Sequence, residues 1–145
     1  MAVNTWEGYL FASIDGSGNI IQKFPDKYIA LESYEVTPNQ REEIKAYRDD
    51  YTRNLTRVTA TGMKNKITFI TRENLHLNEI YEVDTFFTSA EVNATERKIR
   101  LKYWNQEDYA YTTGYFYRPN KSYKMRKISN TDIIYDKVGY ELIEY

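Results

Sequence analysis

The sequence predicts a mainly β protein, a β-sandwich or barrel of about eight strands with one flanking α-helix. Three observations indicate this class. Short segments rich in Val, Ile, Thr and aromatic residues recur along the chain, with turn-forming residues between them. Only residues 78–92 repeat apolar side chains at helical spacing. The length of 145 residues suits a single domain, taken as 1–145, which can bury a core without disulfides or metal.

The N-terminal part of the chain predicts a hairpin followed by a less regular segment. Residues 7–14 form the first expected strand, and residues 15–19 (Asp-Gly-Ser-Gly-Asn) form the turn. The return strand starts at Ile20. Residues 27–31 are either another short strand or a continuation of the return strand past Pro25.

Residues 32–54 predict a long polar arm, because charged side chains dominate and apolar ones are scattered. Thr37, Pro38 and Gln40 match a helix start, which would allow a short helix over 38–47. Only two apolar side chains would line such a helix, too few to anchor it. We therefore favour an extended arm docked on another surface, since a free loop of this length is unusual in a compact domain.

The middle of the chain predicts a second hairpin and the single helix. Residues 55–61 and 66–71, both rich in Thr and β-branched side chains, are expected to pair with each other. The helix is expected at about 78–92, with Asn78 as its N-cap and acidic residues in its first turn. Its apolar stripe consists of Ile80, Val83, Phe86, Phe87 and Ala90.

The C-terminal part predicts a third hairpin and two further strands. Residues 98–104 alternate strictly between apolar and polar side chains, and residues 109–117 return as an aromatic strand. Residues 123–128 form a further strand. A closing strand is expected over 133–145.

Motifs that carry catalytic chemistry are absent from the sequence. His76 is the only histidine and there is no cysteine, which excludes paired-histidine and thiolate metal sites and disfavours a Ser-His-Asp triad. No nucleophile elbow or glycine-rich phosphate-binding loop occurs. Asp15, Ser17 and Asn19 have the spacing of a calcium loop, but the glycine and the final glutamate of such a loop are missing. We expect no enzymatic activity, no cofactor and no metal site.

Basic residues cluster in two places on a chain whose net charge is −1. One group alternates along residues 97–102, and the other crowds residues 118–127. The candidate basic face consists of Lys98, Arg100, Lys102, Arg118, Lys121 and Lys124. Basic strands with interleaved aromatic residues can hold single-stranded nucleic acid, so a monomeric β-barrel module that binds it is the alternative function. The small net charge favours solvated faces or salt bridges instead.

The fifteen tyrosines are more than a core of this size can hold. Tyrosine provides a large contact area at low cost in side-chain entropy, and subunit interfaces are enriched in Tyr, Trp and Arg. The surplus therefore indicates either a face that binds sugars or bases, or permanent subunit interfaces.

Five short sequence motifs, taken in their order along the chain, resemble those of small uncharacterised proteins from the tail modules of phages that infect Gram-positive bacteria. The first reads Ser-Tyr-x-x-Thr-Pro-Asn-Gln-Arg and the fourth reads Thr-Gly-x-Phe-Tyr-x-Pro. The five motifs lie at residues 33–41, 47–49, 103–105, 113–119 and 142–145. The resemblance implies a β-sandwich with one flanking helix, similar to the tail-tube and distal-tail proteins that assemble into hexameric rings.

The resemblance implies a non-enzymatic virion structural protein, a ring-forming component of the tail tube, distal tail or tail tip. Its expected partners are copies of itself in a ring, taken as a hexamer, and other tail proteins, including the tube and the tape measure. DNA would pass only as cargo and no membrane is involved. The protein would be made in the host bacterial cytoplasm and reside in the virion. The arm would reach a neighbouring subunit, and the interface candidates are Tyr34, Arg41, Tyr47, Arg48, Tyr51 and Arg53.

Overall fold

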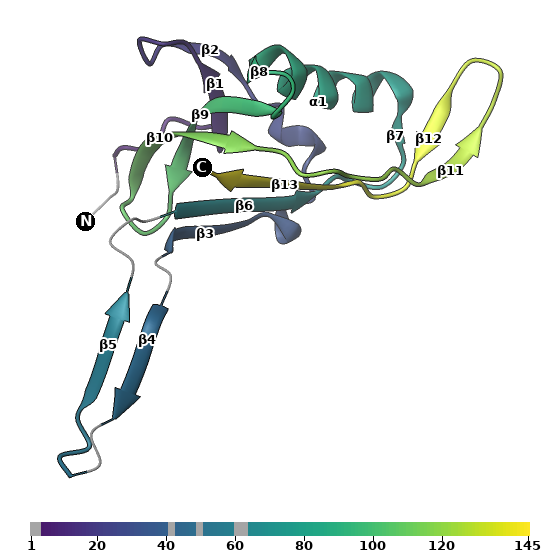
Figure 1. Cartoon of the computed structure of the whole chain (residues 1–145). Helices are drawn as coiled ribbons and strands as arrows, with labels where there is room; N and C mark the ends of the chain where they lie inside the picture. Colours follow the sequence, from purple (N-terminus) through teal and green to yellow (C-terminus); the bar gives the residue numbers. More distant parts are fainter. Residues whose placement is uncertain (1–3, 41–42, 49–50, 60–63) are drawn as a thin grey trace.

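An antiparallel sheet of eight strands forms the body of the protein (Figure 1). The computed structural model describes residues 4–40, 43–48, 51–59 and 64–145. The strands of this sheet are β1 (Phe11–Ile14), β2 (Ile20–Lys23), β3 (Glu35–Gln40), β6 (Lys64–Ile70), β8 (Glu91–Asn93), β9 (Lys98–Asn105), β10 (Ala110–Tyr117) and β13 (Gly139–Glu144). Their order across the sheet is β2-β1-β9-β10-β13-β6-β3, and β8 pairs with β9.

Two smaller sheets and one α-helix complete the described part of the chain. The remaining elements are β4 (Glu43–Arg48), β5 (Leu55–Thr59), β7 (Leu75–His76), α1 (Leu77–Ala90), β11 (Met125–Ile128), β12 (Ile133–Tyr135) and the 3₁₀ turns η1 (Asp26–Tyr28) and η2 (Leu31–Ser33). Strands β11, β12 and β7 form one small sheet, and β4 pairs with β5 in the other. The predicted class, mainly β with one α-helix, is confirmed.

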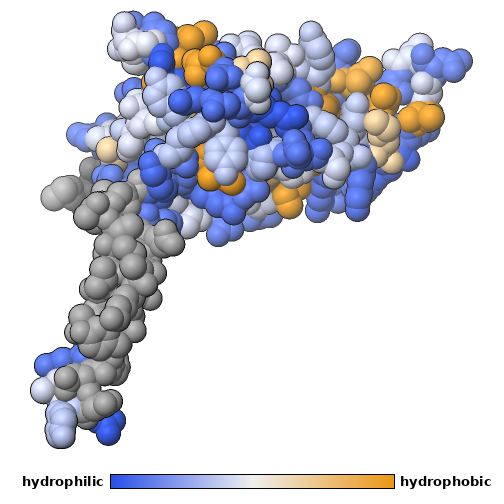
Figure 2. All heavy atoms as spheres, in the orientation of Figure 1, coloured by the Kyte–Doolittle hydropathy of each residue, from blue (hydrophilic) through white to orange (hydrophobic). Residues whose placement is uncertain are grey.

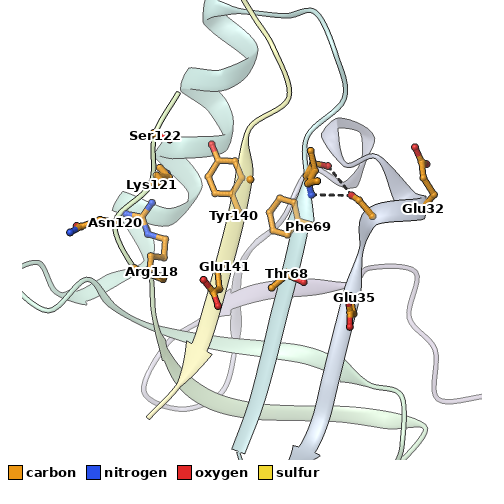
Figure 3. Close-up of a pocket in the computed structure, with 14 residues that line it drawn as sticks. Glu32, Glu35, Thr68, Phe69, Arg118, Asn120, Lys121, Ser122, Tyr140 and Glu141 are labelled. Atoms are coloured by element: carbon orange, nitrogen blue, oxygen red, sulfur yellow. Dashed lines mark hydrogen bonds between the residues drawn. The ribbon is translucent and has the colours of Figure 1, made fainter. Parts of the chain in front are cut away.

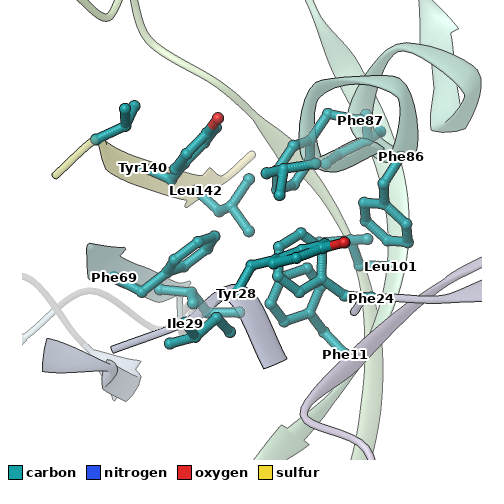
Figure 4. Packing of buried hydrophobic residues seen from close by; sticks show 14 of the residues in the cluster. Phe11, Phe24, Tyr28, Ile29, Phe69, Phe86, Phe87, Leu101, Tyr140 and Leu142 are labelled. Carbon is teal, nitrogen blue, oxygen red and sulfur yellow. The ribbon is translucent and has the colours of Figure 1, made fainter. Parts of the chain in front are cut away.

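The core lies between α1 and one face of the main sheet (Figure 4). Phe24, which follows edge strand β2, lies 5.4 Å ring to ring from Phe69 of β6, near the other edge. The sheet therefore curls around the core. The predicted stripe of α1 is confirmed, because Ile80, Val83, Phe86 and Phe87 are all buried. All six phenylalanines of the sequence belong to this cluster: Phe11, Phe24, Phe69, Phe86, Phe87 and Phe116.

The predicted N-terminal and 98–117 hairpins are confirmed. Strands β1 and β2 pair, and the Asp15 carboxylate at their turn accepts the N–H groups of Ser17 and Asn19, each at 2.9 Å. Asp15, Ser17 and Asn19 thus form an ordinary turn, since the carboxylate is satisfied by backbone donors. Strands β9 and β10 pair over their full length, from Asn105 and Ala110 at the turn to Lys98 and Tyr117.

The predicted hairpin between 55–61 and 66–71 is wrong. Strand β5 pairs with β4, whereas β6 lies between β3 and β13 in the main sheet. The inward face of β6 was predicted correctly, because Ile67 and Phe69 are both buried. A β-branched composition favours a strand but carries no information about its partner, and here the partner of β6 is distant in sequence.

Two other segments also differ from the prediction. Residues 27–31 are not a strand: η1 forms after Pro25, and only Ile29 makes an isolated bridge to Thr71. The single closing strand expected over 133–145 is two strands, β12 and β13, which belong to different sheets. Between them Val138 is held by a hydrogen bond from its N–H to Thr71 Oγ1 at 3.0 Å, which directs the chain from one sheet to the other.

The predicted arm is extended, as favoured, but its limits differ. Residues 35–40 belong to the main sheet as β3, so the predicted start at residue 32 is wrong. The part that leaves the body is the β4–β5 hairpin, which projects away from the main sheet (Figure 1). No short helix forms over the described residues of 38–47.

Helix α1 begins at Leu77 with His76 as its N-cap residue, so the predicted N-cap Asn78 is wrong. The N–H of His76 donates to Glu79 Oε1 at 3.0 Å, and the N–H of Leu77 donates to Asp132 Oδ1 at 3.2 Å. The His76 imidazole Nδ1 also hydrogen-bonds to the Asp132 carboxylate. This contact raises the pKa of His76 and lowers the pKa of Asp132. The start of α1 is thereby tied to the β11–β12 turn.

We predict that the His76 imidazole titrates above its ordinary pKa of 6.5 in the native protein, and that Asp132→Asn returns it towards that value. Because the folded pKa of His76 is raised, its contribution to stability is complete below about pH 6.5 and is lost as pH rises through the folded pKa. Because the folded pKa of Asp132 is lowered, its contribution to stability is complete above about pH 4 and is lost as pH falls through the folded pKa. His76 is the only histidine, so a proton NMR titration follows a single imidazole. Equal pKa values in the native protein and Asp132→Asn would contradict this contact.

Candidate functional site

One row of cations follows β9 on the face of the sheet away from the core. Ile99, Leu101 and Tyr103 are fully buried, so the alternate residues of the strand point outward. Lys98, Arg100 and Lys102 therefore share the outer face, as the alternation predicted.

Tyrosines of β10 lie beside this row of cations. The register places Tyr115 opposite Arg100 and Tyr117 opposite Lys98. The Arg100 guanidinium lies 5.0 Å from the centre of the Tyr115 ring, and its Nε and Nη2 groups donate to the Tyr115 hydroxyl. The Lys98 ammonium lies 4.7 Å from the Tyr115 ring and 4.6 Å from the Tyr145 ring. These contacts hold the cations in place over the sheet.

A stack of three rings continues the same face. Tyr111 lies nearly parallel to Tyr9, with ring centres 4.6 Å apart, and Trp6 stacks on Tyr111 at 6.1 Å. The Lys102 ammonium lies 5.4 Å from the Tyr111 ring, so the stack adjoins the cation row. Tyr9 is buried, whereas Trp6 is 46% exposed at the open end of the stack. We name these six residues the cation–aromatic face: Trp6, Lys98, Arg100, Lys102, Tyr111 and Tyr115.

The second group of basic residues does not join this face, which corrects the sequence-based grouping. Arg118 pairs with Glu91 at 2.9 Å, and their side chains are only 9% and 13% exposed. Lys121 pairs with Asp84 of α1 at 3.0 Å. Lys124 is exposed on the approach to β11. Arg118 and Lys121 therefore hold the segment after β10 against the helix, because acids on neighbouring elements compensate their charge.

Asp84 is the centre of a polar cluster that the sequence did not indicate. Its carboxylate accepts the hydroxyls of Tyr123 and Tyr140, each at 2.8 Å, in addition to the Lys121 ammonium. Burial raises the pKa of both tyrosines, and the Asp84 charge raises them further. Burial lowers the pKa of Lys121, against the opposing effect of Asp84. Asp84 occupies a polar position of an amphipathic helix, where an acid is ordinary. The sequence therefore does not indicate which side chains donate to it.

An open groove of about 670 Å³ lies beside this cluster (Figure 3). Glu32 and Glu35 lie on one side of the groove, residues 118–122 on the other, and the rings of Phe69 and Tyr140 between them. The basic side chains of 118–122 already pair with acids near α1, so they do not form a free cationic site there. Residues 4–40, 43–48, 51–59 and 64–145 contain no group of three His, Cys, Asp or Glu side chains placed to hold a metal ion.

Five of the six interface candidates fall into three groups. Arg41 lies outside the described residues, and Tyr47 and Arg48 lie on β4 of the projecting hairpin. Tyr51, in the connection between β4 and β5, is 96% exposed. Arg53 in the same connection has a left-handed backbone, with φ of 61°.

Tyr34 does not belong to the arm, which corrects its place among the interface candidates. It packs against Phe69, with ring centres 6.2 Å apart. Its hydroxyl is buried, and burial raises its pKa. Tyr34 precedes β3 rather than the hairpin, so its ring contributes to the core.

Comparison with known proteins shows the family but no function. The chain belongs to DUF6711, a family of unknown function, which matches residues 5–145. No curated protein and no solved structure matches the chain. None of the helices in the described part of the chain has the length and apolar character needed to cross a bilayer.

We predict that Asp84→Ala lowers the free energy of unfolding by about 1–3 kcal/mol, because it leaves two partly buried donors, Lys121 and Tyr140, and the more exposed Tyr123 hydroxyl without their acceptor. Chemical denaturation followed by fluorescence measures the change. The matched control is Glu73→Ala, which removes an exposed acid paired with Arg126 and Lys137 and should change stability by less than about 0.5 kcal/mol. Equal effects of the two substitutions would contradict a structural role of Asp84.

Proposed function

We propose that this protein is a non-enzymatic structural subunit that assembles with copies of itself into a ring of a phage tail. The β4–β5 hairpin carries the proposal. Its two strands pair with each other and form a sheet separate from the body. An isolated two-stranded hairpin is at best marginally stable in water, so a hairpin of this kind gains stability when a partner covers it.

Exposed apolar side chains on two edge strands support self-assembly. Ile21 on β2 is 67% exposed and Ile128 on β11 is 71% exposed. In the described part of the chain each of these strands pairs on one side only, and unpaired strand edges are templates for further pairing. Figure 2 shows apolar side chains gathered at the end of the molecule where β11 and β12 lie.

The positions of these edges favour a ring over a simple dimer. Strands β2 and β11 lie at opposite ends of the body (Figure 1). A contact between two unlike surfaces is head-to-tail, and a series of such contacts closes into a ring when the rotation between subunits allows it. The projecting hairpin would then reach a neighbouring subunit.

The assignment to a phage tail comes from the sequence resemblance. The motifs at 33–41, 47–49 and 113–119 resemble tail-module proteins, and the extended hairpin fits the arm which that resemblance implies. We therefore propose a place in the tail tube, distal tail or tail tip, with a hexameric ring as the oligomer. Tube and tape-measure proteins would be its partners, and DNA would pass through as cargo.

We predict that the purified chain forms closed rings at high concentration, and that replacing residues 43–59 by a short Gly-Ser linker leaves a folded monomer. Light scattering gives the mass of the oligomer and electron microscopy shows whether it is closed. The control is Tyr81→Ser, which alters an exposed aromatic residue of α1 away from both edges and should leave assembly unchanged. A strict monomer at high concentration contradicts the proposal, as does unimpaired assembly without the hairpin.

A further inference from the structure

The cation–aromatic face carries positive charge that the protein itself does not neutralise. Among the described residues, Lys98 and Arg100 have no carboxylate partner, and Lys102 has only Glu7 at 3.9 Å. The aromatic side chains beside them, Trp6 and Tyr115, remain exposed to solvent. A surface of this kind favours an anionic ligand with planar groups.

We propose that this face binds single-stranded nucleic acid, with phosphates along the row Lys98, Arg100 and Lys102 and a base stacked on Trp6. The site is independent of the proposed ring, since it uses neither the hairpin nor the edges of β2 and β11.

The spacing of the cations suits a polymer with a regular charge. Residues two apart on a strand are about 7 Å apart, so the three side chains form an evenly spaced row on the sheet. The Arg100 guanidinium uses two of its five N–H donors on the Tyr115 hydroxyl, which leaves donors for a phosphate oxygen. Because tyrosine rings already order the cations, little side-chain entropy is lost when the ligand binds.

The ring stack provides the platform for a base. Tyr9, Tyr111 and Trp6 stack in that order, with interplanar angles of 22° and 16°. Tyr9 at the buried end lies under the Lys23 ammonium at 5.2 Å. Trp104 packs edge to face against Trp6 with ring centres 5.2 Å apart, and Trp6 remains 46% exposed, so the exposed part of Trp6 is the place for another ring. A base stacked on Trp6 would extend this column, and such stacking tolerates any base because every base has a π-face.

The same geometry disfavours an acidic protein segment and a duplex. A peptide strand binds by adding to a sheet edge through backbone hydrogen bonds, whereas this site lies on a sheet face. A duplex offers phosphates but keeps the faces of its bases inside the helix, where Trp6 cannot reach them. A flexible single strand can offer both groups at once.

The test uses the full chain and a twelve-nucleotide deoxythymidine strand. The protein has only two tryptophans, so in Trp104→Phe the fluorescence reports on Trp6 alone. Trp104 packs edge to face against Trp6 and Tyr111, and phenylalanine keeps an aromatic ring at that position; equal affinity of Trp104→Phe and the unaltered chain, measured by fluorescence anisotropy of a labelled strand, shows that the site is intact. We expect quenching of Trp6 on binding. The logarithm of the binding constant should fall with the logarithm of salt concentration with a slope of about −2, since each of three neutralised phosphates contributes about −0.7.

A matched pair of double variants tests the cation row. Lys98→Gln with Lys102→Gln should weaken binding about tenfold at low salt and reduce the steepness of the salt slope by about 1.4. Lys124→Gln with Lys127→Gln makes the same change in net charge on exposed residues near β11 and should leave affinity within about twofold. Circular dichroism of both variants confirms that each is folded.

Several results would overturn the proposal. Equal weakening by the two double variants would mean that net charge alone drives binding. Equally tight binding of a duplex would exclude base stacking, and equally tight binding of polyglutamate would assign the face to an acidic protein. Binding without quenching of Trp6 would place the nucleic acid elsewhere on the chain.

Discussion

Burial of the phenylalanine cluster between α1 and the curled sheet is the interaction on which the rest of the structure depends. One helix covers one face of one sheet, and the polar cluster around Asp84 ties that helix to the chain after β10. In this arrangement the helix covers the apolar inner face of the sheet, and the outer face of β9 and β10 remains exposed to solvent. The cations and tyrosines of the outer face, the hairpin beyond β3 and the exposed edges of β2 and β11 are therefore the parts of the described structure available to partners.

The sequence predicted the elements whose signal is local. Alternation along residues 98–104 and the apolar stripe of the helix both reflect a single face that must be buried, and both are confirmed. The partner of β5 could not be predicted, because its composition is equally compatible with pairing to β4 or β6. The N-cap was displaced because the carboxylate of Asp132, distant in sequence, satisfies the start of the helix.

The difference between local signals and contacts with residues distant in sequence also separates the two groups of candidate site residues. Lys98, Arg100 and Lys102 share a face because strand geometry alone dictates it. Arg118 and Lys121 lie in a segment without regular structure, where tertiary contacts decide which way a side chain points. Both form ion pairs with acids on or next to α1. The tyrosine surplus is likewise divided between the core and the surface. Tyr103 and Tyr140 are buried, whereas Tyr115 and Tyr145 lie on the open face.

The central claim is that the β4–β5 hairpin is completed by a partner. Hydrogen exchange of its backbone amides, measured by mass spectrometry in dilute monomer and in the assembled state, tests this most directly. We predict near-unprotected exchange of the β4 and β5 amides in the monomer and strong protection after assembly, while the amides of β9 and β10 stay protected in both. Equal protection of the hairpin in the two states would contradict the claim, because assembly would then leave the hairpin amides as they are in the monomer.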